Sequence, residues 1–163
     1  MKKKIGNNLT LYYNNFYPKI MKNKSHKIYT VTLGVGGNIG NVINRFKSLF
    51  NILDKDIRFD IISTSPILKN PPFGFLEQND FFNAIIIVKT NISPLRLLKI
   101  TQYYEKKLHR IKTFQDAPRT LDIDIIFIKK NTKNITINTR DLKVPHIDWK
   151  NRQSVKIPLE QMK

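Results

Sequence analysis

The spacing of hydrophobic residues along the chain predicts four β-strands and two α-helices. Apolar or alternating runs, typical of strands, cover about residues 28–33, 58–65, 81–89 and 121–128. Apolar residues three and four positions apart, typical of amphipathic helices, cover about residues 39–53 and 94–109. This order, β-α-β-β-α-β, predicts an α+β fold of the ferredoxin-like kind, an antiparallel sheet with helices packed on it, followed by a C-terminal extension.

Residues at the ends of these segments support the same boundaries. A glycine-rich turn at residues 34–37 ends the first strand, and Asn38 has the side chain of a helix N-cap. Ser93 followed by Pro94 is typical of a helix start. A weaker strand is expected at residues 135–138.

The first 27 residues differ from the rest of the chain. They are basic and rich in asparagine, and their aromatic residues follow no period. We expect residues 1–27 to form a basic N-terminal arm, loosely docked on a single domain that spans residues 28–163. A contact surface for a partner is the alternative function of this arm.

The chain has 163 residues, which fits one domain, and a formal net charge of +17. Basic surfaces attract nucleic acids, anionic membranes or phosphorylated small molecules. Here the basic residues are spread over the whole length and accompany many Ile and Asn residues. A/T-rich coding therefore explains the charge as well as an anionic partner does, and we expect no nucleic acid among the partners.

Several classes of protein are excluded by composition. The chain has no cysteine, and therefore no disulfide framework, thiolate metal site or cysteine nucleophile. The longest aliphatic run, residues 84–88, is far shorter than the roughly 18–20 residues of a membrane span. No apolar stretch follows the lysines at residues 2–4, so no signal peptide is indicated. We expect a soluble, cytoplasmic protein without a membrane partner.

The first candidate for chemistry is the pair Asp122 and Asp124. On a strand, residues two apart point to the same face, so these carboxylates project together while the neighbouring aliphatic residues face the core. Two adjacent carboxylates repel each other unless a cation lies between them, and Mg²⁺ prefers such oxygen ligands. An Asp-x-Asp sequence also occurs at Asp54 and Asp56, in a predicted turn that needs no metal.

Three cations accompany the pair at 122 and 124. Arg119 lies just before the strand, and Arg110 and Lys112 lie on the preceding loop. They serve either as counter-ions of the carboxylates or as ligands of phosphate groups that the metal also binds. Metal and cations around mobile phosphates are typical of phosphoryl transfer. The three histidines are too scattered for a zinc site, and the chain has no P-loop.

Five segments resemble a known family. Pro-Arg-Thr-Leu-Asp-Ile-Asp-Ile, at residues 118–125, is similar to the signature of the 6-hydroxymethyl-7,8-dihydropterin pyrophosphokinases. The other segments resemble further family motifs in the same order: Leu33–Gly40, Pro71–Gly74, Gln78–Ala84, and Val144–His146 with Asn151 and Arg152. The match covers about residues 28–160.

The resemblance implies a ferredoxin-like fold and a direct transfer of diphosphate from ATP to the pterin alcohol, in folate biosynthesis. ATP would be the co-substrate, with two Mg²⁺ ions held by Asp122 and Asp124. By the same resemblance, the catalytic residues are Arg110, Arg119, Asp122 and Asp124. The pterin-binding residues are Asn70, Pro71, Pro72, Phe73, Gly74, Phe81, Asn83 and Arg152. The ATP-binding residues are Gln102, Glu105, Arg110, Lys112, Arg119, Ile126 and His146.

The chain departs from the family pattern at several positions. Gln115-Asp116-Ala117 stands where the family usually has Arg-Trp-Gly, Lys112 where arginine is usual, and Ser154 where an aromatic residue would stack on the pterin. Two alternatives therefore accompany the enzyme interpretation. One is a catalytically weakened paralogue that contacts a neighbouring folate-pathway enzyme, and the other is a ferredoxin-like RNA-binding module, which carboxylates on a strand disfavour.

Overall fold

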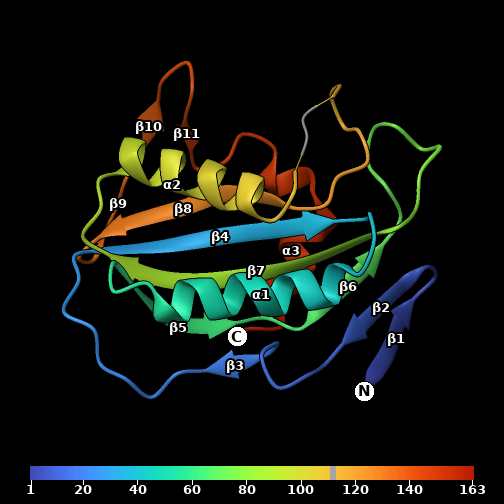
Figure 1. Cartoon of the computed structure of the whole chain (residues 1–163), viewed down its shortest axis with the longest axis horizontal. Coiled ribbons are helices and arrows are strands. Elements are labelled where there is room, and N and C mark those ends of the chain that lie inside the picture. Colours follow the sequence, from blue (N-terminus) through green and yellow to red (C-terminus); the bar gives the residue numbers. More distant parts are fainter. Residues whose placement is uncertain (111–112) are drawn as a thin grey trace.

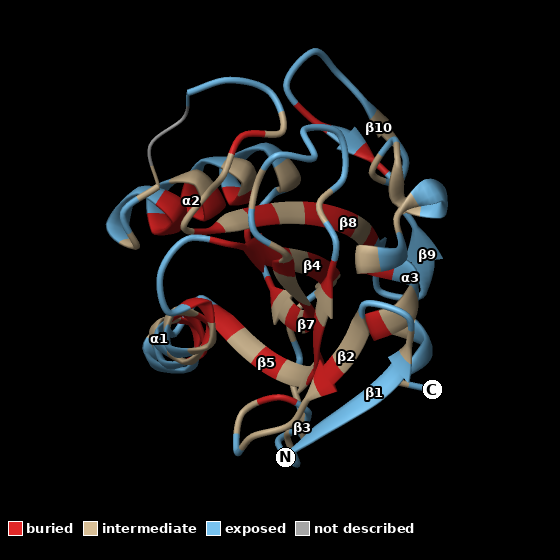
Figure 2. Ribbon diagram, turned by 90° about the vertical axis from the view of Figure 1, so that its right-hand side faces the viewer, coloured by how far each residue is buried: buried red, intermediate tan, exposed pale blue. Residues whose placement is uncertain are grey.

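The computed structural model describes residues 1–110 and 113–163. Its described residues form a sheet with α1 (Val42–Lys55) and α2 (Pro94–Lys107) on one face and α3 (Gln153–Glu160) on the other. Figure 1 shows α1 and α2 lying side by side across the strands, and Figure 2 shows α3 on the opposite side of the sheet. A 3₁₀ turn, Trp149–Asn151, precedes α3.

The centre of the sheet is β4 (Tyr29–Gly37), which pairs with β7 (Phe81–Thr90) on one side and β8 (Asp122–Lys130) on the other. β7 also pairs with β5 (Phe59–Thr64) and β6 (Ile67–Asn70). Every one of these pairings is antiparallel. The remaining strands of the described residues are β1 (Lys2–Gly6), β2 (Leu9–Tyr12), β3 (Lys19–Ile20), β9 (Lys133–Asn134), β10 (Ile137–Asn138) and β11 (Lys143–Val144). The prediction of an α+β domain with an antiparallel sheet is confirmed.

The main core lies between the sheet and the first two helices. Helix α1 buries one stripe, which includes Phe46, Leu49 and Leu53, against the sheet. Helix α2 buries Leu97 and Ile100 in the same cluster. Each such side chain, removed from water, stabilises the fold by about 1.5–3 kcal/mol. The stripes recur every three or four residues, which is why the helices could be predicted from the sequence.

Helix α1 begins later than the sequence predicts. Its N-cap is Asn41, whose Oδ1 accepts a hydrogen bond from the Asn44 N–H over 3.1 Å. Gly40, with a φ of +69°, turns the chain between the strand and the helix, in a conformation that glycine adopts without strain. The Asn38 side chain is buried and bonds to two other loops. The N-cap prediction for Asn38 is therefore wrong, because tertiary partners occupy its amide.

The prediction of a loosely docked arm is wrong for residues 1–20. The hairpin β1–β2 adds two strands to the sheet beside β6, and β3 pairs with β5. Tyr17 is fully buried against Phe46 and Phe50, and its hydroxyl donates a hydrogen bond to the Phe46 carbonyl over 2.9 Å. This segment lacks a hydrophobic period because its strands are short and a few separate residues, such as Leu11, Phe16 and Tyr17, anchor it.

The C-terminal extension contains a helix that the sequence pattern does not reveal. Helix α3 has eight residues, too few for a clear period, and it includes Pro158. Val155 packs with Ile85 and Ile126 in a small second core on this side of the sheet. The weak strand expected at residues 135–138 is found as Ile137–Asn138, paired with β11. Among the described residues, no helix is long and apolar enough to cross a membrane.

Candidate active site

A row of cross-strand neighbours places a carboxylate and an amide on one face of the sheet. Asp122 on β8 pairs with Gly36 on β4, and Gly36 pairs with Asn83 on β7. Directly opposed residues of paired strands point to the same face. Asp124 pairs with Gly34, two residues along the same strands, so both carboxylates share the face that α3 partly covers.

Gly36 keeps the space between the Asp122 and Asn83 side chains open. A Cβ atom at residue 36 would lie 2.5 Å from Asn83 Oδ1, closer than real Cβ contacts allow. The Asn83 amide can therefore lie across β4 only because residue 36 is glycine. Asn83 Nδ2 in turn donates a 2.7 Å hydrogen bond to Asn70 Oδ1, so the two amides hold each other in place.

Asp122 is held by two arginines. Arg110 Nη1 lies 2.5 Å from Asp122 Oδ1, and Arg119 Nη1 lies 3.0 Å from Asp122 Oδ2. Burial opposes the charge of Arg110, but the Asp122 and Glu105 carboxylates outweigh it and raise the pKa of Arg110. The Arg110 Nε–H is buried and has no hydrogen-bond partner among residues 1–110 and 113–163, although it lies in a region of high charge. An anionic ligand would satisfy such a donor.

Asp124 is less well compensated than Asp122. Arg152 Nη1 lies 3.6 Å from Asp124 Oδ2, and the imidazole Nε2 of His146 lies 3.9 Å from the same oxygen. Burial, and then repulsion by Asp122, raise the pKa of Asp124 well above that of an ordinary aspartate. Burial, and then the positive charge of Arg152, lower the pKa of His146, which favours neutral imidazole. A bound cation would relieve the repulsion between the two carboxylates.

The carboxylate pair fits a hard divalent cation that takes part of its coordination from other molecules. The described residues contain no group of three or more His, Cys, Asp or Glu side chains placed to hold a metal ion. Mg²⁺ is commonly bound in this way, by one or two carboxylates together with water and substrate phosphates. The donor set of Asp122 and Asp124 therefore suits Mg²⁺ in the presence of a phosphate ligand.

Glu105 supports the arginine side of the site from helix α2. It is buried, and its Oε1 accepts a 2.8 Å hydrogen bond from the Ile123 N–H, between the two aspartates. The same oxygen lies 3.3 Å from Arg110 Nη1. Glu105 thus joins the helix, the strand and the arginine, and it positions Arg110 against Asp122.

Two cavities with different linings meet at the carboxylate pair. The first has aromatic and amide walls, formed by Asn70, Phe73, Phe81 and Asn83, with Ser154 and Val155 from α3. The second has basic and loop walls that include Arg110, Phe114, Pro118 and His146. Residues common to both are Asp116, Arg119, Asp122, Asp124 and Arg152. Groups bound in the two cavities would face each other across the carboxylates and arginines.

The first cavity suits a flat heterocycle. Phe81 offers a buried aromatic face, and the Arg119 guanidinium lies 5.3 Å from the centre of its ring. Phe73 is exposed at the mouth, with the Arg152 guanidinium 5.8 Å from its ring centre. The amides of Asn70 and Asn83 supply donors and acceptors beside these rings. The cavity therefore combines stacking surfaces with amide hydrogen bonds.

Two loops over the site are tied together by residues that the sequence analysis did not assign to it. Asn38 Oδ1 accepts a hydrogen bond from the Arg119 N–H, and Asn38 Nδ2 donates to Gln78 Oε1, both over 2.9 Å. Gln78 Nε2 donates to the Asp116 carbonyl over 2.8 Å. The rings of Phe75 and Phe114 meet edge to face. These contacts join loop 71–80 to the segment that carries Arg119.

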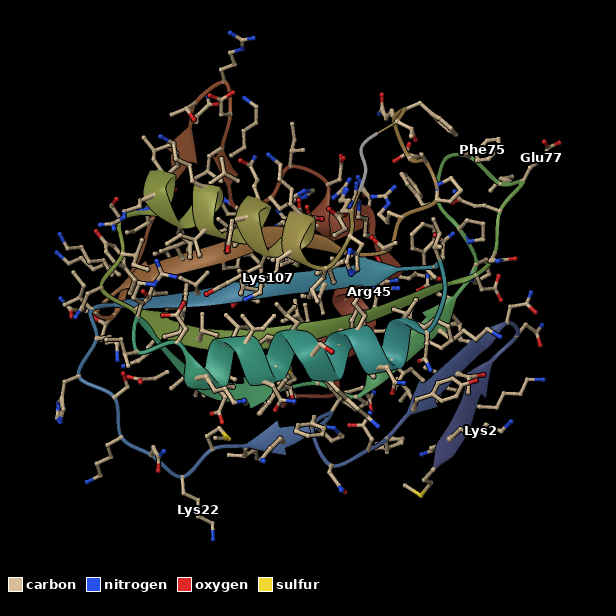
Figure 3. All side chains as sticks on the ribbon, viewed as in Figure 1. Lys2, Lys22, Arg45, Phe75, Glu77 and Lys107 are labelled. Atoms are coloured by element: carbon tan, nitrogen blue, oxygen red, sulfur yellow. The ribbon has the colours of Figure 1, made fainter. Side chains whose placement is uncertain are left out.

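Arg45 braces the same segment from helix α1. Its Nη1 donates to the carbonyls of Ile39 and Thr120, each over 2.8 Å. Burial lowers the pKa of Arg45. Figure 3 shows Arg45 rising from α1 toward the end of the sheet where loop 71–80, with Phe75 and Glu77, also lies. Asn38 and Gln78 lie in segments that resemble family motifs, and that position was the sequence signal for them. Arg45 lies outside every such segment, so no sequence signal indicated it.

The remaining described residues that were assigned from the resemblance are not among the residues that line the two cavities. Gly74 adopts a φ of +80°, and a Cβ there would overlap the Asp116 carboxylate. Pro71 is exposed and Pro72 half-buried at the start of the same loop. Gln102 is half-buried on α2 and lines neither cavity. The Ile126 side chain is fully buried in the second core, and its carbonyl accepts a 2.9 Å hydrogen bond from the His146 N–H. Lys112 lies outside the described residues.

Comparisons with known proteins find one family and several similar enzymes. The family model described as 7,8-dihydro-6-hydroxymethylpterin-pyrophosphokinase matches residues 32–163. The 2-amino-4-hydroxy-6-hydroxymethyldihydropteridine pyrophosphokinase of Campylobacter jejuni is 42% identical over 144 residues, which are 88% of this chain and 89% of the relative. The enzyme of the same name from Helicobacter pylori is 37% identical over 146 residues, 88% of this chain and 87% of the relative. The chain therefore belongs to the 7,8-dihydro-6-hydroxymethylpterin-pyrophosphokinase family.

Proposed function

We propose that this protein transfers diphosphate from ATP to 6-hydroxymethyl-7,8-dihydropterin and releases AMP, as a step of folate biosynthesis. The observation that carries the proposal is the meeting of two cavities, one aromatic and amide-lined and one basic, at Asp122 and Asp124. The names of the Campylobacter jejuni and Helicobacter pylori relatives support the same reaction. The family model matches residues 32–163, which include every residue of the proposed site.

In the proposed reaction the pterin occupies the first cavity. Phe81 stacks on the ring, while Asn83 and Asn70 hydrogen-bond its edge. Phe73 and Arg152 border the same space, and Pro71, Pro72 and Gly74 of the same loop would complete the pterin site. This orientation directs the pterin hydroxymethyl group toward the carboxylate pair. Holding the two substrates in this way converts a bimolecular encounter into a reaction within one complex.

The triphosphate occupies the second cavity, beside Arg110, Arg119 and His146. The pterin hydroxymethyl oxygen forms a bond to the β-phosphorus of ATP, and the bond from that phosphorus to the oxygen that bridges it to the α-phosphorus breaks. AMP leaves with that oxygen, and the hydroxyl proton passes to solvent. Arg110 and Arg119 offer fixed guanidinium donors to the phosphate oxygens on which negative charge develops. Gln102, Glu105, Lys112 and Ile126 complete the proposed ATP site.

Asp122 and Asp124 would hold Mg²⁺, and we propose two ions shared with the ATP phosphates. When bound, Mg²⁺ would neutralise part of the negative charge of the phosphates. In the structure Arg110 and Arg119 contact Asp122. When a cation binds to this carboxylate, both guanidinium groups would be free to contact phosphate. Asp124, whose charge is poorly compensated, gains most from such a cation.

Three finer assignments belong to the same proposal. The strand order β8-β4-β7-β5, with α1 and α2 on one face, supports a ferredoxin-like topology for the segment from β4 to β8. A substrate such as ATP supports a cytoplasmic location. In Schizosaccharomyces pombe, the matching region is 18% of a longer folic acid synthesis protein, which supports contact with a neighbouring enzyme of that synthesis.

The test is AMP release from ATP and Mg²⁺, with and without 6-hydroxymethyl-7,8-dihydropterin, for the wild type and for Asp122→Asn and Asp124→Asn. We expect pterin-dependent AMP from the wild type and a loss of about a hundred- to a thousandfold in kcat in each variant, the scale of losing one preorganised electrostatic group. Asp54→Asn, outside the site, is the matched control and should retain full activity. Well-folded wild-type protein that releases no AMP would refute the proposal and favour a weakened paralogue.

A further inference from the structure

The N-terminal hairpin lies outside the region that the family model matches, yet it is built into the sheet next to the first cavity. The match begins at residue 32, whereas β1 and β2 lie within residues 2–12. β2 pairs with β6 in register, Thr10 with Lys69, Leu11 with Leu68 and Tyr12 with Ile67. Figure 1 shows the hairpin at the end of the sheet that also carries loop 71–80.

One cross-strand row connects this hairpin with the carboxylate site. Leu11 pairs with Leu68, and Leu68 pairs with Asn83. Asn83 then pairs with Gly36, and Gly36 with Asp122. The four side chains of this row, those of Leu11, Leu68, Asn83 and Asp122, therefore point to the face of the first cavity. Leu11 and Leu68 are 1% and 0% exposed, so the outer part of the row is packed as core.

Strand β6 depends on both of its neighbours. It has four residues, and its last residue, Asn70, accepts the hydrogen bond of Asn83. Pro71 and Pro72 follow directly and have no N–H to extend the ladder. Among the described strands β6 pairs with β7 and β2, so removal of β2 would leave four residues at an open edge.

The hairpin can be perturbed without loss of the main core. Tyr17, which is bonded to the Phe46 carbonyl, anchors the chain after the hairpin. Tyr12 contacts Phe82 edge to face, with ring centres 5.6 Å apart, and thereby touches β7 beside Asn83. Leu11 does not belong to the core cluster that contains Phe46 and Leu53.

We propose that the N-terminal hairpin is a positioning element for the pterin site. By clamping β6 against β7, Leu11 holds the Asn70–Asn83 amide pair in the geometry that recognises the edge of the heterocycle. This inference rests on the proposed function for the identity of the ligand. Leu11 touches no substrate, so it is a positioning residue and not a catalytic one.

The test compares Leu11→Ala and a deletion of residues 2–12 with Leu53→Ala, a leucine equally buried in helix α1. Calorimetry would measure binding of 6-hydroxymethyl-7,8-dihydropterin in the presence of Mg²⁺ and a non-hydrolysable ATP analogue, and binding of the analogue alone. We expect the pterin Kd to rise about tenfold in both hairpin variants, the scale of one lost hydrogen bond, with the analogue Kd unchanged. Leu53→Ala should lower the Tm but leave the pterin Kd unchanged.

A second measurement separates this inference from the proposed function. The side-chain amide signals of Asn70 and Asn83, followed by ¹⁵N NMR in the ligand-free protein, should shift or broaden in Leu11→Ala and not in Leu53→Ala. Wild-type protein that fails to bind the pterin would refute the proposed function, while these signals would still decide the role of the hairpin. Unchanged amide signals and an unchanged pterin Kd in Leu11→Ala, or equal effects of Leu53→Ala, would overturn the inference.

Discussion

Gly36→Ala is the smallest change that should disable the pterin side of the site. The added Cβ would lie 2.5 Å from Asn83 Oδ1, so the Asn83 side chain must turn away. That movement breaks its 2.7 Å hydrogen bond to Asn70 Oδ1 and withdraws an amide from the ligand. Each lost hydrogen bond costs about 0.5–1.5 kcal/mol. Two such losses amount to about 1–3 kcal/mol, or about 5- to 150-fold weaker pterin binding.

The assay is calorimetric titration with 6-hydroxymethyl-7,8-dihydropterin in the presence of Mg²⁺ and a non-hydrolysable ATP analogue. Gly34→Ala is the matched control, on the same strand and the same face. Its Cβ would first meet Ile126 Cδ1, at 3.2 Å, so the strain falls on a core methyl group and not on the Asn83 amide. Gly34 also lines the first cavity, so we expect Gly34→Ala to lower the Tm and to weaken pterin binding much less than Gly36→Ala does. Wild-type pterin affinity in Gly36→Ala would refute the reasoning.

Three further predictions follow from contacts outside the cavities. The Arg58 guanidinium, aided by the Tyr104 hydroxyl and opposed by burial, holds the pKa of Asp56 well below its usual range. Because the folded-state pKa is lowered, this contact stabilises the fold above the ordinary pKa of aspartate and the stabilisation fades as the pH falls below about 5. Urea unfolding of Asp56→Asn should therefore show a flatter loss of stability in acid, and an unchanged acid slope would contradict this. Tyr17→Phe removes the hydroxyl bond to the Phe46 carbonyl and should lower the free energy of unfolding by about 1 kcal/mol in urea, with AMP release unaffected. Arg45→Met removes the Nη1 atom that donates to both the Ile39 and the Thr120 carbonyls, so kcat for AMP release should fall several-fold. An unchanged kcat would show that Arg45 does not position the Arg119 segment.

Much of the fold could be predicted from local periodicity. The strands β4, β5, β7 and β8 and the helices α1 and α2 lie where apolar residues recur with the period of each element. Long buried stripes give this signal because one face of each element meets the core. The short elements gave no such signal: β1, β2, β3 and α3 are too brief for a period, and their sequence context is polar.

The sequence by itself determined the carboxylate pair. Asp122 and Asp124 had to share a face once they lay on a strand, because side chains of a strand alternate. The arginines of the neighbouring loop followed from proximity along the chain. The resemblance to known motifs then supplied candidate roles for residues that no spacing could relate, such as Asn83 and His146.

Only the tertiary structure decided what surrounds that pair. The row from Asp122 through Gly36 and Asn83 to Leu11 joins five strands whose register is set by pairing across the sheet. Asn38, which looks like a helix cap in the sequence, instead bonds two loops, because its partners come from distant segments. Periodicity reports which face of an element is buried; which residues meet on that face depends on strand register and loop closure, and these are properties of the whole folded chain.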